Sequence, residues 1–548
     1  MASTSKSRTG GQILVDALRI HGANLAFGVP GESYLPILDA FLNVPEIRFI
    51  ICRQEGGAAM AADAYGKLTG RPGICFVTRG PGATNASAGL HVAHQDSTPM
   101  ILFIGQVELA MQEREAFQEI DYRKMFGSMA KWVGQIDTAA RIPEFVSRAF
   151  HVAVSGRPGP VVLVLPEDML AQQAEVADLP AYRHIEAEPG AEALARLAAE
   201  LSQSEKPLAI LGGAGWTSDA VAEFTAFAEA QQIPVAASFR AQDRLDNRHP
   251  LYVGHMGIGP DPKLAARVRE ADLLLVAGAR LGEATTSGYT LPPAPKPPQR
   301  FIHVYPDASE LGRVYQPDLG IVSGMIGFAS AARRLIAMNI AKRQAWAKAA
   351  RVDYEAFVQP TIIPGDVQYG EIVCNLRAQL PDETIVTNGA GNYAIWVHRF
   401  WQYRRYRTQL APTSGSMGYG LPAAVAAKLV YPDYPVVAFA GDGCFQMTGQ
   451  EFATAIHYGV PVMVVVVDNG LYGTIRMHQE REFPGRPSGT SLINPDFAAL
   501  ARAYGGHGET VVKTDDFMPA FNRAIASGKP AIIHVKLDSR AVTPGSKP

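Results

Sequence analysis

Two short polar turns in the last third of the chain carry residue types that could bind a metal ion and a phosphate group. Gly441-Asp442-Gly443 follows the apolar run 436–440, and Asp468-Asn469-Gly470 follows the apolar run 461–467. Carboxylate and amide oxygens are hard donors of the kind that Mg²⁺ prefers beside a phosphorylated ligand. Glycines also let backbone N–H groups come close to an anion. Because Gly-Asp-Gly is equally an ordinary turn, the motif alone leaves both interpretations open.

The elements around these turns form a predicted strand–helix–strand unit. Both apolar runs are short enough to be buried strands of a parallel sheet. Between them, apolar and small residues recur at helical spacing, namely Phe452, Ala455, Ile456 and Gly459. In such units the chemistry gathers at the carboxyl ends of the strands, which is where both polar turns lie.

Composition excludes several classes of protein. The 548 residues are 47% hydrophobic and 19% charged with a net charge of -2, so we expect several packed domains and no nucleic-acid partner. The four cysteines are scattered, which argues against a disulfide framework or a zinc site. The first ten residues lack an apolar signal core, and no apolar run approaches the roughly 20 residues that span a bilayer. We expect a cytoplasmic protein without a membrane segment.

The pattern along the chain predicts an α/β fold made of three doubly wound parallel-sheet domains. Short apolar runs that end in glycine-rich turns and continue into helical patterns recur throughout, as in parallel sheets with helices on both faces. Polar, proline-containing stretches near residues 176–190 and 341–368 separate three blocks of similar size. The predicted domains are residues 8–175, 190–345 and 365–540.

A glycine-rich turn in the middle block invites a nucleotide-binding interpretation. Gly212-Gly213-Ala214-Gly215 follows a predicted strand, but it lacks G-x-G-x-x-G spacing and a well-placed acidic partner. We interpret it as a turn that allows close packing, and an ordinary nicotinamide dehydrogenase is therefore disfavoured.

Three further motifs, together with the two polar turns, resemble those of the thiamine diphosphate-dependent decarboxylases and carboligases. They are Arg53-Gln54-Glu55-Gly56-Gly57-Ala58, Gly80-Pro81-Gly82-Ala83-Thr84-Asn85 and the segment 414–424. The resemblance covers nearly the whole chain and is closest to the acetohydroxyacid (acetolactate) synthase branch, through Gly105-Gln106-Val107 and the segment 116–119. It implies an N-terminal pyrimidine-binding domain, a central domain and a C-terminal diphosphate- and Mg²⁺-binding domain.

The resemblance implies a role for three residues around the thiamine rings. Glu55 would be the catalytic carboxylate that hydrogen-bonds the pyrimidine and activates the cofactor, although a glutamate at a helix start is also favoured by the helix dipole. The Gly415 carbonyl would accept from the cofactor's amino group. Met417 would wedge between the two rings, where core filling is its alternative role.

The resemblance also implies how the diphosphate is held. Mg²⁺ would be bound by Asp442, Asn469 and the backbone carbonyl of Leu471. The phosphates would contact backbone N–H groups in two turns, at Gly443 and Cys444 and at Gly391, Asn392 and Tyr393.

For the substrate pocket the resemblance implies candidates through the family's Phe-Gln-Glu segment, which contains Gln118, and through the segment that follows the metal-binding turn. They are Gln118, Tyr472, Ile475 and Arg476, with Lys131 and His478 as weaker candidates. Arg476 could pair with a carboxylate or phosphate, but a solvated helix face explains it equally well.

Some positions depart from the family's pattern. Gln54 stands where a histidine is usual, and no adjacent His-His pair is present. Arg157 fits the branch that carries a flavin, whereas Gly254-His255-Met256-Gly257 and the segment 279–283 fit it poorly, so the balance is against FAD. The segment 470–476 looks more like that of benzoylformate decarboxylase.

The expected activity is thiamine diphosphate-dependent decarboxylation of a 2-oxo acid, with carboligation to a carbonyl acceptor as in acetolactate synthase. Alternatives are cleavage of a 2-hydroxyacyl-CoA or oxalyl-CoA, a simple decarboxylase, or a non-catalytic subunit. The last is disfavoured because Glu55, Asp442 and Asn469 are all present. In this family the glutamate and the diphosphate site come from different chains, so the resemblance implies a homodimer or homotetramer.

Overall fold

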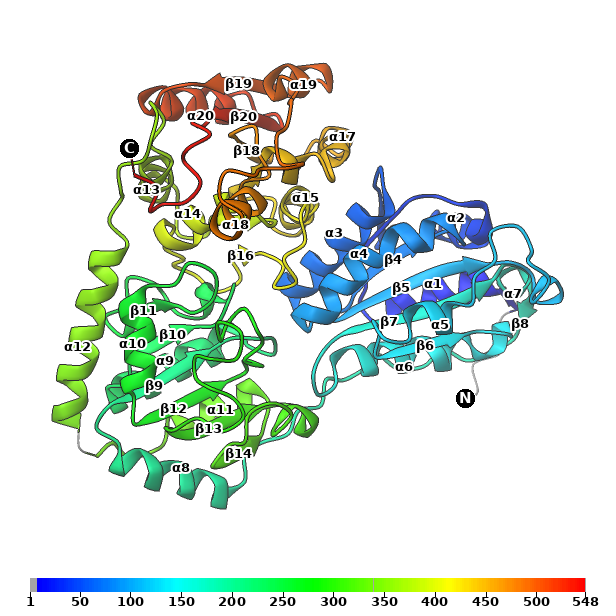
Figure 1. Ribbon diagram of the computed structural model, residues 1–548. Coiled ribbons are helices and arrows are strands. Elements are labelled where there is room, and N and C mark those ends of the chain that lie inside the picture. Colours follow the sequence, from blue (N-terminus) through cyan, green and yellow to red (C-terminus); the bar gives the residue numbers. More distant parts are fainter. Residues whose placement is uncertain (1–6, 339, 548) are drawn as a thin grey trace. The chain divides into compact units, whose positions relative to one another are not determined.

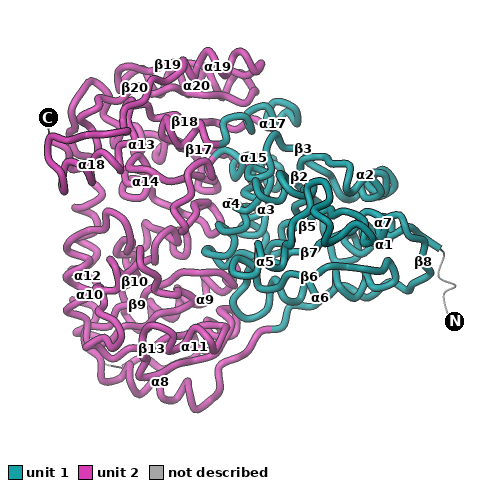
Figure 2. Tube along the Cα trace, turned by 45° about the vertical axis from the view of Figure 1, so that its right-hand side comes forward, with its two compact units in different colours: residues 1–185, 421–432, 448–460 teal, residues 186–420, 433–447, 461–548 magenta. Residues whose placement is uncertain are grey.

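The computed structural model describes residues 7–338 and 340–547, and these form three six-stranded sheets with helices packed on them (Figure 1). Two compact units contain them (Figure 2). Unit 1 comprises Met1–Ile185, Leu421–Pro432 and Thr448–Val460, and unit 2 comprises the rest of the chain. Part of the polar N-terminus considered above, residues 1–6, lies outside the described residues. Within the described ranges, no helix is long and apolar enough to cross a membrane.

The N-terminal sheet is parallel throughout and has the strand order β3-β2-β4-β5-β7-β6. Its strands are β2 (Leu25–Gly28), β3 (Arg48–Ile51), β4 (Gly73–Val77), β5 (Met100–Gln106), β6 (Trp132–Gln135) and β7 (Pro160–Pro166). Its helices are α1 (Gly10–Ile20), α2 (Leu35–Phe41), α3 (Glu55–Thr69), α4 (Pro81–Asp96), α5 (Tyr122–Phe126), α6 (Ile142–Val154) and α7 (Glu167–Ala171). A small antiparallel pair joins β1 (Arg8–Thr9) to β8 (Gln173–Ala174).

Helices α3 and α4 pack closely because small residues line their contact. A Cβ at Gly89 would lie 2.4 Å from the Cβ of Ala59, so no larger residue fits there. Near the far end of the pair, partly buried Lys67 lies 3.1 Å from buried Asp63 and also pairs with Asp96. Burial opposes the charged ammonium, but the two carboxylates raise the pKa of Lys67. Close packing and these ion pairs thus fix α3, the helix that begins at Glu55, against α4.

The central sheet is also parallel, with the order β11-β10-β9-β12-β13-β14. Alternate residues of its strands enter two separate apolar cores, one on each face. The strands are β9 (Pro207–Leu211), β10 (Val235–Ala237), β11 (Tyr252–His255), β12 (Leu273–Ala277), β13 (Arg300–Tyr305) and β14 (Leu319–Val322). The helices are α8 (Ala191–Gln203), α9 (Ser218–Gln231), α10 (Pro262–Glu270), α11 (Met325–Ala332) and α12 (Ile340–Phe357).

The C-terminal sheet repeats this design with the order β16-β15-β17-β18-β20-β19. Its strands are β15 (Ile385–Asn388), β16 (Gln409–Leu410), β17 (Val436–Gly441), β18 (Met463–Asp468), β19 (His507–Val511) and β20 (Ala531–Lys536). Its helices are α13 (Tyr369–Gln379), α14 (Tyr393–Phe400), α16 (Asp442–Phe445), α18 (Gly473–Glu482), α19 (Phe497–Ala503) and α20 (Phe517–Ala526). Two further helices of this part of the sequence, α15 (Gly420–Val430) and α17 (Phe452–His457), fall almost entirely in unit 1.

The predicted fold class, three doubly wound parallel-sheet domains, is confirmed. The sequence pattern missed the two-stranded pair β1 and β8, and in the six-stranded sheets it missed four strands that all lie at edges: β6, β11, β14 and β16. Edge strands are short and pair on one side only, so the apolar run that reveals a central strand is weak in them.

Candidate active site

The C-terminal sheet brings two glycine turns together at the point where its strand order reverses. Strand β15 pairs with β17, and the turns that follow them are Gly389-Ala390-Gly391-Asn392 and Asp442-Gly443. Ligands of doubly wound sheets bind outside the carboxyl ends of the strands at such a reversal. The predicted diphosphate residues therefore lie at the edge of the sheet that suits a ligand.

The thiol of Cys444 joins these turns to the segment that carries Met417. Its Sγ accepts a hydrogen bond from the Gly418 N–H at 3.2 Å and lies 3.3 Å from the hydroxyl of Tyr393. A Cβ at Gly389 would lie only 2.6 Å from the same sulfur. The Tyr393 hydroxyl in turn accepts from the Gly389 N–H at 2.9 Å. Partly buried Met417 packs on the apolar core beside this cluster.

Asn392 and Gly415 differ in how the structure holds them. The side chain of Asn392 accepts from Thr474 at 2.8 Å, so it is tied to the start of α18. Gly415 adopts φ +69 in open space, and its conformation is one that favours glycine. Gly391 also has a positive φ, +141.

Asp442 is a buried carboxylate in the predicted metal site, 3% exposed. Its Oδ1 accepts from the Gly443 N–H at 2.9 Å, and its Oδ2 accepts from the Gly470 N–H at 3.0 Å and from Asn494 Nδ2 at 2.7 Å. Burial raises the pKa of Asp442 to about 6, and the neighbouring Asp468 adds to the rise. A divalent cation at this position would therefore stabilise the charged carboxylate.

A second carboxylate, Asp468, lies at the end of the neighbouring strand. Asn494 Nδ2 donates to its Oδ1 at 2.8 Å, while His534 Nε2 and Lys536 Nζ lie 2.8 and 2.6 Å from its Oδ2. Burial opposes its charged form, but the hydrogen bonds from His534 and Lys536 hold the pKa of Asp468 well below its usual range. Asp468 therefore stays charged and is already compensated by the protein.

The donors at this edge fit Mg²⁺ in type. Register places Gly441 opposite Val467, so Asp442 comes one residue and Asn469 two residues after this pair. Asn469 is half-buried, and its Oδ1 accepts from the Leu471 N–H at 3.3 Å. No group of three His, Cys, Asp or Glu side chains within residues 7–338 and 340–547 could hold a metal. A cation here would need amide and backbone oxygens, as predicted for Asn469 and the Leu471 carbonyl.

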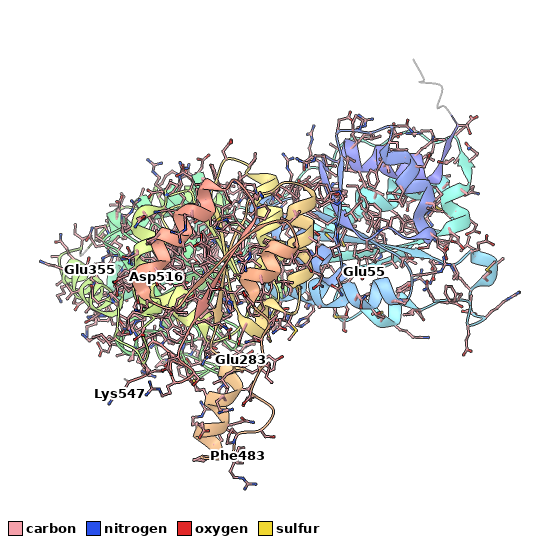
Figure 3. The ribbon with its side chains drawn as sticks, turned by 90° about the horizontal axis from the view of Figure 1, so that it is seen from above. Glu55, Glu283, Glu355, Phe483, Asp516 and Lys547 are labelled. Atoms are coloured by element: carbon pink, nitrogen blue, oxygen red, sulfur yellow. The ribbon has the colours of Figure 1, made fainter. Side chains whose placement is uncertain are left out.

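The substrate residues predicted in unit 2 are Tyr472, Ile475 and Arg476, and they begin directly after Leu471, the last of the predicted metal ligands. A Cβ at Gly443 would lie 2.5 Å from the ring of Tyr472, so this ring lies against the Gly443 backbone. Ile475 is 54% exposed on α18. Helix α18 projects from the rest of unit 2, with Phe483 at its end (Figure 3). The guanidinium of Arg476 donates to the hydroxyls of Thr490 and Ser491, at 2.8 and 3.2 Å, within the same unit.

In unit 1, Glu55 is the first residue of α3 and is half-buried (Figure 3). Its Oε2 accepts from Asn85 Nδ2 at 2.9 Å. A Cβ at Gly82 would lie 3.4 Å from its Oε1, so the glycine leaves space beside the carboxylate. The structure therefore brings together two motifs that are separate in the sequence.

Gln118 lies against the turn that precedes α4. Gly80 adopts φ +56 and ψ -108, and a Cβ there would lie 2.8 Å from the Cβ of Gln118. The Gly80 N–H donates to the Tyr122 hydroxyl at 2.8 Å, and Arg79 Nε donates to the Phe117 carbonyl at 3.2 Å. Gln118 itself has φ +66, a strained value for a residue with a side chain. The loop is thus fixed beside the Glu55 region.

Several residues have roles other than those considered from the sequence. Lys131, a weak substrate candidate, donates to the carbonyls of Val152 and Ser155 at the end of α6, at 2.5 and 2.6 Å. Gln54 caps α3 by accepting from the Gly57 N–H at 3.0 Å. Sequence reasoning missed Asn494, Asp468 and Glu451, because long-range contacts alone reveal them. Asp468 was visible beside Asn469 but carried no distinguishing signal.

The glycine turn of the central domain is used for packing. A Cβ at Gly213 would lie 1.8 Å from the Gly278 carbonyl, so the backbones after β9 and β12 meet directly. Trp216 Nε1 donates to the Gly212 carbonyl at 2.9 Å, and Arg244 donates to that of Gly213 at 2.8 Å. The carbonyls of this turn therefore have partners within the chain, as expected of a turn used for packing.

Comparison with known proteins identifies the class to which this fold and site belong. Residues 8–125, 194–332 and 389–535 match, in order, the N-terminal TPP binding domain, the central domain and the C-terminal TPP binding domain of thiamine pyrophosphate enzymes. The chain belongs to the thiamine pyrophosphate enzyme family. It is thus an enzyme that depends on this cofactor and forms or cleaves carbon–carbon bonds.

Similar proteins include three acetolactate synthases. The large subunit from Corynebacterium glutamicum is 32% identical over 536 residues, which cover 94% of this chain and 84% of the relative. The large subunit from Lactococcus lactis is 34% identical and covers 91% and 88% of the two chains. The isozyme 2 large subunit from Escherichia coli is 30% identical and covers 96% and 95%.

Proposed function

We propose that this enzyme uses thiamine diphosphate and Mg²⁺ to decarboxylate a 2-oxo acid and to join the remaining fragment to a carbonyl acceptor. The observation that carries the proposal is Glu55, a half-buried carboxylate at the start of α3 that is held by Asn85. The names of the acetolactate synthase relatives support a 2-oxo acid substrate. The proposed domains are residues 8–175, 190–345 and 365–540, and the proposed location is the cytoplasm.

Each residue near the cofactor would have a specific role. When bound, the cofactor supplies a thiazolium carbon that acts as a nucleophile toward a carbonyl group. Glu55 would hold a proton at the pyrimidine ring, and the Gly415 carbonyl would accept from the amino group on that ring. Met417 would support the bent shape of the cofactor.

The diphosphate would be held at the edge of the C-terminal sheet. Asp442, Asn469 and the Leu471 carbonyl would bind Mg²⁺, which fits the oxygen donors found there. Backbone groups at Gly443 and Cys444 would contact the phosphates, together with the turn formed by Gly391, Asn392 and Tyr393. Gln118, Tyr472, Ile475 and Arg476 would line the substrate pocket.

We further propose a homodimer or homotetramer with active sites at the subunit interface. Glu55 belongs to unit 1 and Asp442 to unit 2. Apolar side chains near both regions are exposed, including Phe117 at 72% and Ile493 at 102%. Such side chains commonly become buried in oligomers. Light scattering on the purified protein tests this proposal, and an active monomer would contradict it.

We leave flavin outside the proposed cofactor set, because Gly254-His255-Met256-Gly257 and the segment 279–283 fit the flavin-carrying branch poorly. An absorbance scan of the purified enzyme tests this point. The visible absorbance band of a flavin, present in an amount equivalent to the enzyme, would contradict it.

Turnover by a Glu55→Gln variant tests the catalytic proposal. Loss of a general acid–base group typically costs ~10²–10⁴-fold in rate, so carbon dioxide release should become nearly undetectable while the cofactor still binds. Glu144→Gln is the matched control, since Glu144 lies in the first turn of α6 and is exposed. Full activity of Glu55→Gln would contradict the proposed catalytic role of Glu55.

A substrate screen separates the remaining alternatives. Carbon dioxide release should be measured across 2-oxo acids with and without an aldehyde or 2-oxo acid acceptor. A product that contains the acceptor supports the carboligase. Release that never yields such a product points to a simple decarboxylase, as the resemblance of segment 470–476 suggests. Tight binding of CoA and cleavage of its thioesters would favour an acyl-CoA lyase.

A further inference from the structure

A buried carboxylate lies against the first turn of the helix that carries Glu55. Glu451 ends the 3₁₀ turn η6 (Gly449–Glu451), directly before α17, and is only 1% exposed. The segment Thr448–Val460 belongs to unit 1, as does α3. The residues before and after this segment belong to unit 2. The segment therefore leaves unit 2, packs within unit 1 and returns.

Both oxygens of Glu451 accept hydrogen bonds. Oε1 accepts from the backbone N–H groups of Arg53 and Gln54, both at 3.0 Å. Oε2 accepts from the Thr454 hydroxyl at 2.6 Å and lies 3.3 Å from the Arg53 nitrogen. All these neighbours donate, and the start of a helix favours negative charge. The side chain therefore suits an anion, although burial raises the pKa of Glu451 against the opposing effect of these hydrogen bonds.

The Glu451 side chain packs closely against the first turn of α3. A Cβ at Gly57 would lie 2.7 Å from Glu451 Oε1 and 2.8 Å from its Cγ, so the glycine allows the carboxylate to lie against the helix. Gln54 caps the same turn from its own side chain. Hydrogen bonds thus hold the backbone on both sides of Glu55. Glu451 binds the N–H groups of Arg53 and Gln54 before it, and the Gln54 side chain binds the Gly57 N–H after it.

An ordinary helix cap would not need this arrangement. Ser, Thr, Asp or Asn at the cap position satisfies the first N–H groups of a helix from the surface. Burying a second carboxylate costs free energy unless several donors satisfy it, and here the donors are the amides that precede Glu55. The burial therefore points to control of position at Glu55 rather than to a cap alone.

We propose that Glu451 is a positioning residue that orients Glu55 toward the cofactor. The inference rests on the proposed function, since it assigns Glu451 an effect only through Glu55. Glu451 holds the backbone of residues 53 and 54, and this backbone sets where the Glu55 side chain begins. A shift of about 1 Å in a catalytic group can lower the rate ~100-fold.

The test measures cofactor activation directly in Glu451→Gln. Exchange of the thiazolium C2 proton of bound thiamine diphosphate for deuterium, followed by NMR after quenching, should slow by about 10–100-fold. The dissociation constant of the cofactor should change by less than about threefold. In the protein without cofactor, the backbone amides of Arg53 and Gln54 should exchange faster with deuterated solvent than in the wild type.

A double variant shows whether Glu451 acts through Glu55. Exchange at C2 in Glu55→Gln/Glu451→Gln should be no slower than in Glu55→Gln alone, because the two residues act as a unit. Glu451→Asp keeps the charge and should recover part of the rate. The control is Glu509→Gln, which removes a partly buried carboxylate paired with Arg523 and His507 and should leave C2 exchange unchanged.

The outcomes separate this inference from the proposed function. If Glu55→Gln exchanges normally at C2, the proposed function fails. If Glu55→Gln is defective but Glu451→Gln stays within about twofold of the wild type, or if the two losses multiply in the double variant, the positioning role alone is overturned. Should Glu451→Gln fail to fold, Thr454→Val replaces it, since it removes the hydroxyl that donates to Glu451, and normal C2 exchange in that variant would overturn the role.

Discussion

The side-chain amide of Asn494 donates to Asp442 Oδ2 across 2.7 Å, which fixes the orientation of the predicted metal ligand. The same nitrogen donates to Asp468 across 2.8 Å, so one amide bridges two carboxylates at neighbouring strand ends. Two neighbouring carboxylates repel each other unless hydrogen-bond donors or cations lie between them. Asn494 therefore supports the metal site without being one of its predicted ligands.

Replacing Asn494 by alanine should weaken Mg²⁺ binding by about 10–100-fold, the usual effect of losing a residue that orients a metal ligand. Asp442 would lose the hydrogen bond that orients its Oδ2. No amide would then lie between the carboxylates of Asp442 and Asp468. Isothermal titration of the protein with Mg²⁺ in the presence of thiamine diphosphate measures the change.

Asn522→Ala provides the control for that experiment, because Asn522 is exposed on α20. Its Mg²⁺ affinity should equal that of the wild type. Unchanged affinity in Asn494→Ala would show that Asp442 keeps its orientation without the bridge.

Mg²⁺ affinity should depend on pH through Asp442. Because burial raises the pKa of this carboxyl to about 6, a proton competes with the cation below that pH. The affinity should fall about tenfold per pH unit below pH 6 and level off above it. Titrations at pH 5, 6, 7 and 8 check this, and equal affinities between pH 5 and 7 would contradict it.

The sign of the accompanying stability change follows from the same shift. Without the cation, a carboxyl whose folded pKa is raised contributes stability at low pH that is lost as the pH rises from about 4 to about 6. The lowered pKa of Asp468 acts in the opposite sense, because its contribution is lost as the pH falls. Added Mg²⁺ should therefore raise the melting temperature more at pH 7 than at pH 5.

Gly80→Ala should impair the enzyme more than it destabilises the fold. The backbone at Gly80 adopts φ +56, and the new Cβ would meet Gln118 at 2.8 Å, so the loop that carries Gln118 must move. We expect a loss of at least tenfold in kcat/KM and a destabilisation of about 1–3 kcal/mol. Steady-state kinetics and thermal melts measure both effects.

Gly190→Ala is the matched glycine control. Gly190 has φ -67 and no neighbour within 4 Å of an added Cβ. Its activity and melting temperature should stay at wild-type values. Normal kcat/KM in Gly80→Ala would show that the position of Gln118 does not matter for the reaction.

Lys67→Met should destabilise unit 1 by about 3–5 kcal/mol, because it removes the cation that compensates the buried carboxylates of Asp63 and Asp96 between α3 and α4. Denaturant unfolding measures the loss. In contrast, Lys342→Met removes an exposed partner of Glu205 and should change stability by less than about 1 kcal/mol. Equal effects of the two variants would contradict this account of the helix pair.

Much of the fold could be predicted because its central strands are continuous apolar runs that end in glycine turns. The runs around Ala438 and Val465 became the central strands β17 and β18, which pair as expected for a parallel sheet. Four edge strands, β6, β11, β14 and β16, were missed because strands that pair on one side only carry a weaker apolar pattern, whereas the edge strands β3 and β19 were predicted. The predicted alternation of strand and helix then followed from burial on both faces of each sheet.

The sequence by itself determined the chemistry that the site can support, because glutamate, aspartate, asparagine and glycine turns carry their properties with them. Only the tertiary structure decided which groups surround them. Glu451 lies hundreds of residues from Glu55 along the chain, and Asn494 reaches Asp442 from a separate loop. No local sequence pattern predicts such contacts, because the free energy of a buried carboxylate depends on hydrogen-bond donors that folding brings from distant parts of the chain.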